Sequence, residues 1–352
     1  MKEKIKLCLI GSGFVGKKHA AAYKQQNEVK LQVVCDTNEL SAIKLAEEYG
    51  FERIETNWNK AVCAEDVDLV CVCVPNNAHF EIVSEAIKHN KNISCEKPLG
   101  MNRRESEKLA KLAKEKEIIG ACCYNIVRLP AIIYAHSIIK SGKLGKIVCF
   151  RGSYDNDRLA NPNANFEWRM LKKNATGGSI SDLAINILAV SQFLMGDITS
   201  VCGMTDIIHK KRTTPDGNLT EVENDDIAQF MCTYKNGAMG YITSNRVAPG
   251  SKQDMCFEIK LTKGTIKFSL ERMNEIQVYT LGESGFSTVI SDENGWFNVG
   301  YEELKAIDAN ILINNIKNKT YADIDFSFAA KIDSVIESVL ESAEKRIWIN
   351  IL

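Results

Sequence analysis

IKLCLIGSGFVG, residues 5–16, is the stretch of sequence that decides the fold. Its apolar first half predicts a β-strand, and its second half holds three glycines with the spacing G-x-G-x-x-G. A helix-like segment follows, and a second apolar run, residues 31–35, ends in Asp36. Strand, glycine turn, helix, strand and acid in this order are what a dinucleotide-binding βαβ unit requires. The alternative is a glycine-rich turn that holds no ligand.

Each glycine of the turn has its own expected role. Gly11 allows the tight turn, Gly13 lets the backbone approach a pyrophosphate, and Gly16 lets the helix pack close to the strand. The start of the helix offers free N–H groups and a partial positive charge to the phosphates. We expect the backbone of the remaining turn residues to take part in the same contact: Ser12, Phe14 and Val15.

Asp36 indicates which dinucleotide is bound. It lies 20 residues after Gly16, where a carboxylate can accept hydrogen bonds from both ribose hydroxyls. The same carboxylate would repel a 2′-phosphate. The sequence therefore favours NAD as the cofactor over NADP.

The composition is that of an ordinary globular protein. The 352 residues suggest about two domains, and 45% of them are hydrophobic and 25% charged. The formal net charge of −1 gives no sign of a nucleic-acid or membrane-surface partner. No apolar stretch approaches the ~20 residues of a membrane span. Because the N-terminal residues run straight into the first strand, we expect no signal peptide.

Twelve cysteines are present, and most of them fall within predicted strands. Reduced cysteine behaves there as a small buried hydrophobic residue. No C-x-x-C pair occurs and the five histidines are scattered, so we expect no metal site. A reducing, cytoplasmic compartment fits this pattern best.

The organisation of the chain changes near residue 125. Residues 1–125 alternate strands and helices, which predicts an α/β domain with a doubly wound parallel sheet that binds NAD. Residues 126–352 contain longer alternating segments, which predict an α+β domain on an open, mainly antiparallel sheet. We expect this second domain to bind substrate and to form an oligomer interface. The predicted strands are 5–10, 31–35, 68–74, 93–95, 118–123, 147–154, 198–208, 226–235, 238–247, 254–262, 264–270 and 275–281, and the predicted helices are 14–26, 39–49, 78–89, 102–116, 130–141, 181–195, 301–316 and 325–345.

Ligands of a parallel sheet bind beyond the carboxyl ends of its strands. Lys97 is expected at this edge, and the proline after it restrains the backbone to extended geometry and aims the ammonium into the cleft. There Lys97 would hydrogen-bond a reacting hydroxyl and stabilise developing alkoxide charge, although a solvated loop lysine is the alternative. The residues expected to line the cofactor path at the same edge are Pro75, Asn76, Asn77, His79, Glu96, Lys97 and Asn125.

A second cluster follows the glycine pair 177–178. Asp182 and Asn186 are four residues apart and share one face of a predicted helix. We expect Asp182 to pair with Lys97 across the domain boundary. The alternative is an acid favoured by the helix dipole, beside a solvated asparagine. The loop before the helix carries residues that suit a polyol or sugar, and suit a surface loop equally well: Tyr154, Asp155, Trp168 and Arg169.

Taken together, these motifs resemble the Gfo/Idh/MocA family of sugar and inositol dehydrogenases over nearly the whole chain. The family's marks are the N-terminal glycine motif, P-N-x-x-H at 75–79, E-K-P at 96–98, and the glycine pair 177–178 with Asp182. A weaker similarity to the branch that contains levoglucosan and myo-inositol dehydrogenases is carried by three segments: 151–154, 168–169 and 271–275.

The resemblance implies an N-terminal Rossmann domain and an NAD(H)-dependent oxidoreductase. A secondary alcohol of a sugar, sugar derivative or inositol would lose hydride to nicotinamide C4 and a proton to a base. Lys97 and Asp182 match the family's catalytic lysine and aspartate, whereas Asn186 stands where the family has histidine. Asparagine cannot take a proton at physiological pH, although it can still orient a hydroxyl.

Several interpretations of that departure remain open. Lys97 is itself the base, with a pKa lowered by burial or by the nicotinamide cation. A tyrosine or aspartate of the loop 154–158, or water, replaces the histidine. The protein has lost dehydrogenase activity and acts as an NAD-binding sensor. It catalyses an NAD-dependent glycoside cleavage. The expected partners are a small sugar or polyol and further copies of this chain, as a dimer or tetramer.

Overall fold

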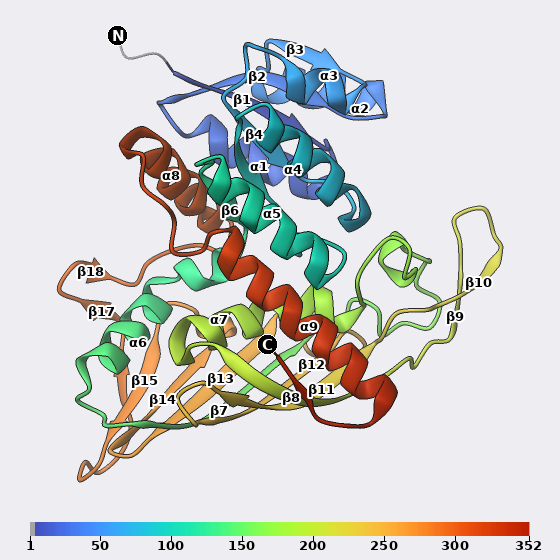
Figure 1. The fold of residues 1–352 in the computed structure, drawn as a ribbon. Coiled ribbons are helices and arrows are strands. Elements are labelled where there is room, and N and C mark those ends of the chain that lie inside the picture. The colour runs from blue at the N-terminus through green and yellow to red at the C-terminus, as the bar shows by residue number, and fades with distance from the viewer. Residues whose placement is uncertain (1–3, 352) are drawn as a thin grey trace. The chain divides into compact units, whose positions relative to one another are not determined.

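Six parallel strands form the sheet of the N-terminal part of the chain (Figure 1). The computed structural model describes residues 4–351. The strand order β3-β2-β1-β4-β5-β6 is that of a doubly wound dinucleotide-binding sheet and confirms the predicted fold class. The strands are β1 (Ile5–Ile10), β2 (Val29–Cys35), β3 (Arg53–Glu55), β4 (Leu69–Val72), β5 (Asn92–Cys95) and β6 (Gly120–Cys122).

Some helices of this part begin at an asparagine cap. The Asn38 side chain accepts the Ser41 N–H, and the Asn102 side chain accepts the Glu105 N–H. Strand β3 and helix α3 were not predicted, because each is only a few residues long and β3 has no fully buried residue. The helices are α1 (Phe14–Lys24), α2 (Glu39–Tyr49), α3 (Trp58–Cys63), α4 (His79–Lys88), α5 (Arg103–Glu115) and α8 (Glu303–Asn318).

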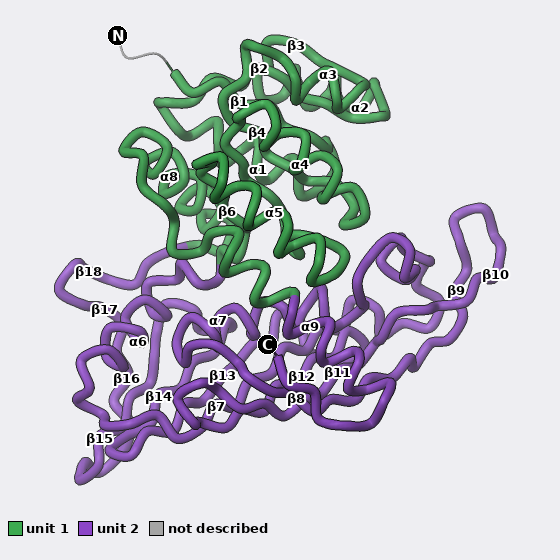
Figure 2. The backbone as a smooth tube through the Cα atoms, in the orientation of Figure 1, with its two compact units in different colours: residues 1–125, 300–333 green, residues 126–299, 334–352 purple. Residues whose placement is uncertain are grey.

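The chain folds into two compact units (Figure 2). The first unit contains the chain up to Asn125 together with residues 300–333, and the second contains 126–299 and 334–352. The expected change at residue 125 coincides with one point where the chain passes from the first unit into the second. Residues 300–333, which the sequence analysis placed in the second domain, belong to the first unit. The reason is hydrophobic: Leu312 and Ile313 of α8 are buried in the core formed by β1, β2 and β4.

The second unit is built on a nine-stranded sheet of order β16-β15-β14-β13-β7-β12-β11-β8-β19. Only β7 (Ile147–Asp155) and β12 (Met239–Asn245) pair in parallel within it, which confirms the mainly antiparallel prediction. Its other strands are β8 (Ile198–Asp206), β11 (Ile227–Tyr234), β13 (Asp254–Leu261), β14 (Gly264–Ser269), β15 (Ile276–Thr280), β16 (Ser287–Val289) and β19 (Ile349–Asn350). Two short hairpins were not predicted: β9 (Lys211–Thr213) with β10 (Leu219–Glu221), and β17 (Ser291–Asp292) with β18 (Gly295–Trp296).

The predicted helix 181–195 is irregular at its start. Residues Ile180–Ala184 form a wide π-helical turn, and the regular helix α7 spans Ile185–Met195. The Asn186 side-chain nitrogen donates to the carbonyl oxygens of Asp182 and Leu183, at 2.9 and 3.3 Å. Such a side-chain bond competes with the backbone ladder and accompanies the loss of regular spacing there. The other helices are α6 (Pro130–Ser141) and α9 (Phe326–Lys345), which passes from the first unit into the second.

All twelve cysteines are free thiols. Among residues 4–351, no helix combines the length and the apolar composition that crossing a membrane demands.

Candidate active site

The glycine turn has the backbone geometry that its sequence predicts. Gly11 has a φ of +98°, and a Cβ there would lie 2.3 Å from the Cys73 carbonyl oxygen. A Cβ on Gly16 would lie 1.9 Å from the Gly11 carbonyl oxygen, so helix and turn are in close contact. A Cβ on Gly13 would meet nothing within 4 Å. The turn is therefore closed at Gly11 and Gly16 and open at Gly13, as a pyrophosphate cradle needs to be.

The N-terminus of α1 is chemically prepared for an anion. Gly13 is the N-cap residue and offers no side-chain cap, and the first turn carries no acidic residue. The N–H groups of that turn therefore keep their partial positive charge for a ligand. Phe14 is 77% exposed beside them, with the Lys18 ammonium 4.6 Å from its ring centroid.

Asp36 lies at the end of β2 and fixes the glycine turn. One of its carboxylate oxygens accepts bonds from the Ser12 N–H at 2.7 Å and from the Ser12 hydroxyl at 2.8 Å. The other oxygen accepts the Asn38 N–H at 2.9 Å. The contact with Ser12 was not predicted. The ribose-binding role of Asp36 stays a prediction, and a bound ribose would share its carboxylate with the turn.

The loop after β4 is shaped by His79. Its ring is fully buried, with Nδ1 2.7 Å from the Pro98 carbonyl oxygen and Nε2 3.0 Å from that of Val74. His79 thereby joins the loops after β4 and β5. It would act at the cofactor edge of the sheet by holding the backbone of these loops in place. Asn76 is buried in the short turn before it, whereas Asn77 is exposed.

Glu96 is the centre of a buried charge cluster. Its carboxylate lies 2.7 Å from His19 Nε2 on α1 and 2.7 Å from the Lys305 ammonium on α8. Burial alone would raise the pKa of Glu96, but the Lys305 charge and the His19 hydrogen bond hold it well below its usual range. Burial likewise opposes the charge on Lys305, and Glu96 raises its pKa nevertheless. The partnership of His19 and Lys305 with Glu96 was not predicted, because neither residue has a local sequence signal.

Two thiols lie beside this cluster. Cys71 and Cys73 have their sulfur atoms 3.6 Å apart. Burial disfavours ionisation of Cys71, yet the hydrogen bond from Cys73 and the charge of His19 lower its pKa to about 5. Burial lowers the pKa of His19, and the negative charge on Cys71 outweighs this and raises it well above its ordinary value.

Lys97 follows Glu96 directly, beyond the end of β5. It is half-buried, and the peptide bond to Pro98 is cis. Asn125 begins a short 3₁₀ turn after β6 and is half-buried too. Lys97 belongs to the first unit and Asp182 to the second, so their pairing stays a prediction.

Asp182 lies among guanidinium groups of the second unit. Its carboxylate is 3.2 Å from Arg158 Nη2 and 3.7 Å from Arg169 Nε. Arg158 also contacts both oxygens of Glu167, at 2.5 and 2.7 Å. Arg169 stacks on Trp168, with its guanidinium carbon 4.2 Å from the ring centroid. The structure thus brings together three of the predicted substrate residues, Asp182, Trp168 and Arg169.

Tyr154 and Asp155, expected in a loop, are the last two residues of β7, and Asp157 follows them. Tyr154 is buried and its hydroxyl donates to Gln253. Partial burial and the negative charge of Asp254 raise the pKa of Asp155. Asp157 lies 2.6 Å from the exposed Lys252 ammonium, and that hydrogen bond lowers its pKa.

Asp225 holds the glycine pair that precedes the π turn. One of its oxygens accepts the Gly178 N–H at 2.7 Å, and the other accepts the Ile180 N–H at 2.9 Å. A Cβ on Gly178 would lie 1.8 Å from the Asp225 carbonyl oxygen. Asp225 therefore fixes the backbone that carries Asp182 and Asn186, a role that sequence analysis missed.

A dinucleotide turn on a doubly wound sheet, followed by an α+β unit with a cluster of acids and arginines, defines a two-domain oxidoreductase. The chain belongs to the Gfo/Idh/MocA family. The family described as an oxidoreductase family with an NAD-binding Rossmann fold matches residues 5–122, and the GFO/IDH/MocA C-terminal domain matches residues 132–267. This family includes NAD-dependent sugar and polyol dehydrogenases, and its Rossmann domain binds NAD.

Relatives with named activities agree with this assignment. Levoglucosan dehydrogenase of Pseudarthrobacter phenanthrenivorans is 29% identical over 378 residues, which cover 97% of each chain. The scyllo-inositol 2-dehydrogenase (NAD(+)) of Bacillus subtilis is 26% identical over 86% of this chain and 84% of its own. A structure of levoglucosan dehydrogenase in complex with NADH and L-sorbose has a TM-score of 0.95 and 28% identity, covering 99% of both chains. The expected family and cofactor are thereby confirmed.

Proposed function

We propose that this protein oxidises a secondary alcohol of a sugar, sugar derivative or inositol, or reduces the corresponding ketone. The observation that carries the proposal is the glycine turn, closed at Gly11 and Gly16 and open at Gly13, with Lys97 at the end of a strand in the same sheet. The relatives named for levoglucosan and scyllo-inositol support a cyclic polyol as substrate class.

The Rossmann residues would hold the cofactor by backbone contacts. The N–H groups of Phe14 and Val15 would bind phosphate, Asp36 would bind the adenosine ribose, and Asn76 and Asn125 would line the path to the nicotinamide. Bound NAD supplies a hydride acceptor at nicotinamide C4. The carboxylate of Asp36 would also exclude a 2′-phosphate, because the two negative charges repel each other.

Lys97 is the residue that we propose handles the reacting hydroxyl. Its ammonium would donate to the substrate oxygen and stabilise alkoxide charge as it develops. When neutral, the same amine would take the hydroxyl proton. Asp182, oriented by Arg158 and Arg169, would accept a neighbouring hydroxyl and hold the substrate. Asn186 spends its amide nitrogen on backbone carbonyls, so its oxygen is the atom that would accept a substrate hydroxyl.

Asp155 is a second candidate for the proton acceptor. Burial and Asp254 raise its pKa toward the range where a general base works well. Tyr154 is a weaker candidate, because its buried hydroxyl already donates to Gln253. The alternative function, an NAD-binding sensor without turnover, is favoured by one observation only: Asn186, bonded to backbone, supplies no base.

The test is turnover by the full chain. We expect reduced nicotinamide to appear when the protein is given NAD with levoglucosan, inositols or sugars, and Lys97→Met to abolish this while NAD still binds. Asp155→Asn serves as the matched variant. If only Asp155→Asn lowered the rate, Asp155 would be the proton acceptor. NAD binding without turnover on any sugar, sugar acid, amino sugar or inositol would establish the sensor instead.

We further propose a homo-oligomer formed through the outer face of the second unit's sheet, in a cytoplasmic, reducing compartment. Four apolar side chains are exposed on neighbouring strands of that face, Met204 on β8, Met231 on β11, and Met239 and Tyr241 on β12. An exposed apolar stripe on a sheet is typical of an interaction surface. Light scattering on purified protein gives the oligomeric state, and Met231→Lys should shift it toward monomer.

A further inference from the structure

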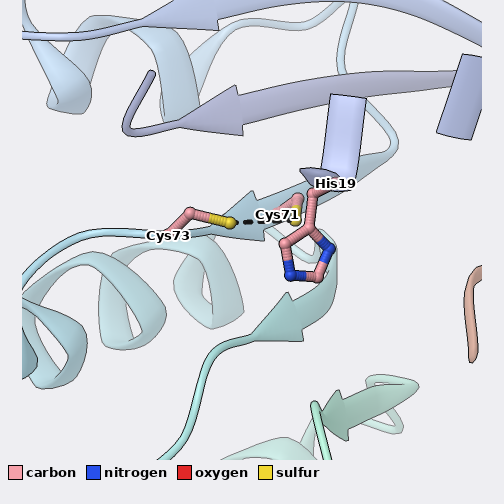
Figure 3. A group of neighbouring side chains, drawn as sticks. All are labelled: His19, Cys71 and Cys73. Atoms are coloured by element: carbon pink, nitrogen blue, oxygen red, sulfur yellow. Dashed lines mark hydrogen bonds between the residues drawn. The ribbon is translucent and has the colours of Figure 1, made fainter. Parts of the chain in front are cut away.

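A group of sulfur and nitrogen ligands is buried in the first unit beside the glycine turn. His19 comes from α1, Cys71 lies on β4, and Cys73 follows that strand (Figure 3). Their ligand atoms all lie within 4.8 Å of one another. Figure 3 shows the imidazole ring lying next to the paired sulfur atoms. A second group that shares His19 contains Glu96 and Cys123, again within 4.8 Å.

The spacing of the two sulfur atoms is that of a tetrahedral metal site. Zinc–sulfur bonds of about 2.3 Å at the tetrahedral angle place two sulfurs about 3.8 Å apart. The sulfur atoms of Cys71 and Cys73 are 3.6 Å apart, so only a small adjustment separates them from that geometry. The two residues are two apart on an extended segment, which puts both side chains on the same side of the sheet.

A disulfide competes poorly for the same thiols. Two residues apart in an extended strand, the Cα atoms of Cys71 and Cys73 are separated by about 6.6 Å, at the upper end of the range that a disulfide spans. A metal ion between the sulfur atoms does not require the two residues to move closer together. The thiols are therefore placed better for shared coordination than for oxidation to each other.

The surroundings of His19 support the same role. Its Nε2 lies 2.7 Å from the Glu96 carboxylate and 3.1 Å from the Lys305 ammonium, so we place the metal on the other ring nitrogen, Nδ1. A carboxylate on the far nitrogen is the arrangement by which metal-binding histidines are commonly oriented. The charges also balance, because two thiolates neutralise a divalent ion while Glu96 and the Lys305 ammonium, 2.7 Å apart, neutralise each other.

We propose that His19, Cys71 and Cys73 form a three-residue binding site for a thiophilic metal ion, Zn²⁺ in the first place. None of these ligands is among the residues proposed to handle substrate, so the metal would have a structural part. Cys73 donates its N–H to the Ile10 carbonyl at 2.8 Å, and its own carbonyl contacts the glycine turn.

The experiment uses the full-length protein, purified with reductant and stripped of metal. Titration with Co²⁺ should give sulfur-to-cobalt charge-transfer absorption and tetrahedral bands that saturate at one ion per chain. Zn²⁺ should then displace Co²⁺ at the same stoichiometry. Cys71→Ser and Cys73→Ser should each weaken Zn²⁺ binding about 100-fold or more.

Two control variants separate this site from other thiols. Cys256→Ser removes a half-buried thiol of the second unit and should leave Zn²⁺ affinity unchanged. Cys63→Ser tests a more exposed group, Cys63 with Glu85 and His89, whose ligand atoms also lie within 4.8 Å. Because Cys71 is fully buried and its variant can fail to fold, Cys73→Ser is the decisive change, and NAD binding checks that it folds.

Three results would overturn the proposal. One is the absence of charge-transfer absorption with Co²⁺ in the reduced protein. Another is unchanged Zn²⁺ affinity in a folded Cys73→Ser variant. The third is loss of the single bound ion in Cys63→Ser, which would place the metal at the exposed group.

Discussion

Replacing Gly16 and Gly13 by alanine, one at a time, separates packing of the glycine turn from binding of the cofactor. A Cβ on Gly16 would lie 1.9 Å from the Gly11 carbonyl oxygen, so the two must move apart by about 1.5 Å to reach ordinary contact at 3.4 Å. Overpacking against backbone costs about 3 kcal/mol. For a unit of this size, that lowers Tm by about 6–12 °C.

Gly13→Ala is the matched change, because the added Cβ meets nothing within 4 Å. Gly13 is the N-cap residue of α1 with φ of −69°. Alanine is a poorer N-cap than glycine by about 0.5–1 kcal/mol, and the lower conformational entropy of the unfolded chain with alanine offsets a similar amount. Its methyl group would stand where we place the pyrophosphate, and we expect the Kd for NAD to rise about 10- to 100-fold, or about 1.4–2.8 kcal/mol.

The assays are thermal unfolding without ligand and calorimetric titration with NAD. The reasoning predicts opposite outcomes for the two variants: Gly16→Ala loses stability, and Gly13→Ala keeps its Tm and loses affinity. A Gly16→Ala protein with an unchanged Tm would refute the close contact of helix and turn. If Gly13→Ala left the NAD affinity unchanged, the phosphates would not bind at the N-terminus of α1.

Three further changes test the buried charges. Glu96→Gln removes a carboxylate whose pKa lies well below 4.5. The stability that the charged carboxylate contributes is complete above that pH and is lost as the pH falls through the folded-state pKa. Urea titrations should therefore show wild type losing more unfolding free energy than the variant between about pH 5 and pH 3. Lys305→Met leaves Glu96 without its ammonium partner and should cost about 3–5 kcal/mol by urea unfolding, whereas a loss below about 1 kcal/mol would mean that His19 suffices. Asp225→Asn loses one of the two hydrogen bonds from the Gly178 and Ile180 N–H groups. We expect the free energy of unfolding to fall by about 1–2 kcal/mol and kcat to fall as well. An unchanged kcat would mean that the π turn does not depend on Asp225.

Features set by local spacing could be predicted from the sequence. The strand, turn and helix around Gly11 and Gly16 depend on residues within one βαβ unit, and the structure reproduces them. The Rossmann strands fall within a few residues of their expected bounds, because buried parallel strands are continuous apolar runs. The same reasoning failed for β3, which lacks such a run, and for the π turn, whose geometry depends on Asp225 from another part of the chain.

Partners across long sequence distances were beyond sequence reasoning. His19 and Cys71 give no metal-ligand spacing when read along the chain, so the expectation of no metal site rested on local patterns alone. The fold brings α1 and β4 together and creates a ligand group that no motif describes. Tests of sequence spacing therefore exclude only those metal sites whose ligands lie close together in the chain.

The return of residues 300–333 to the first unit has a consequence for Lys97. Helix α8 supplies apolar side chains to the core and also the Lys305 ammonium that pairs with Glu96. Glu96 immediately precedes Lys97, so the backbone that carries the proposed catalytic amine is fixed by a cation from a distant segment. A buried carboxylate without a partner would cost several kcal/mol and would move or protonate. We therefore expect the positioning of Lys97 to depend on Lys305, a residue that motif comparison around E-K-P does not reveal.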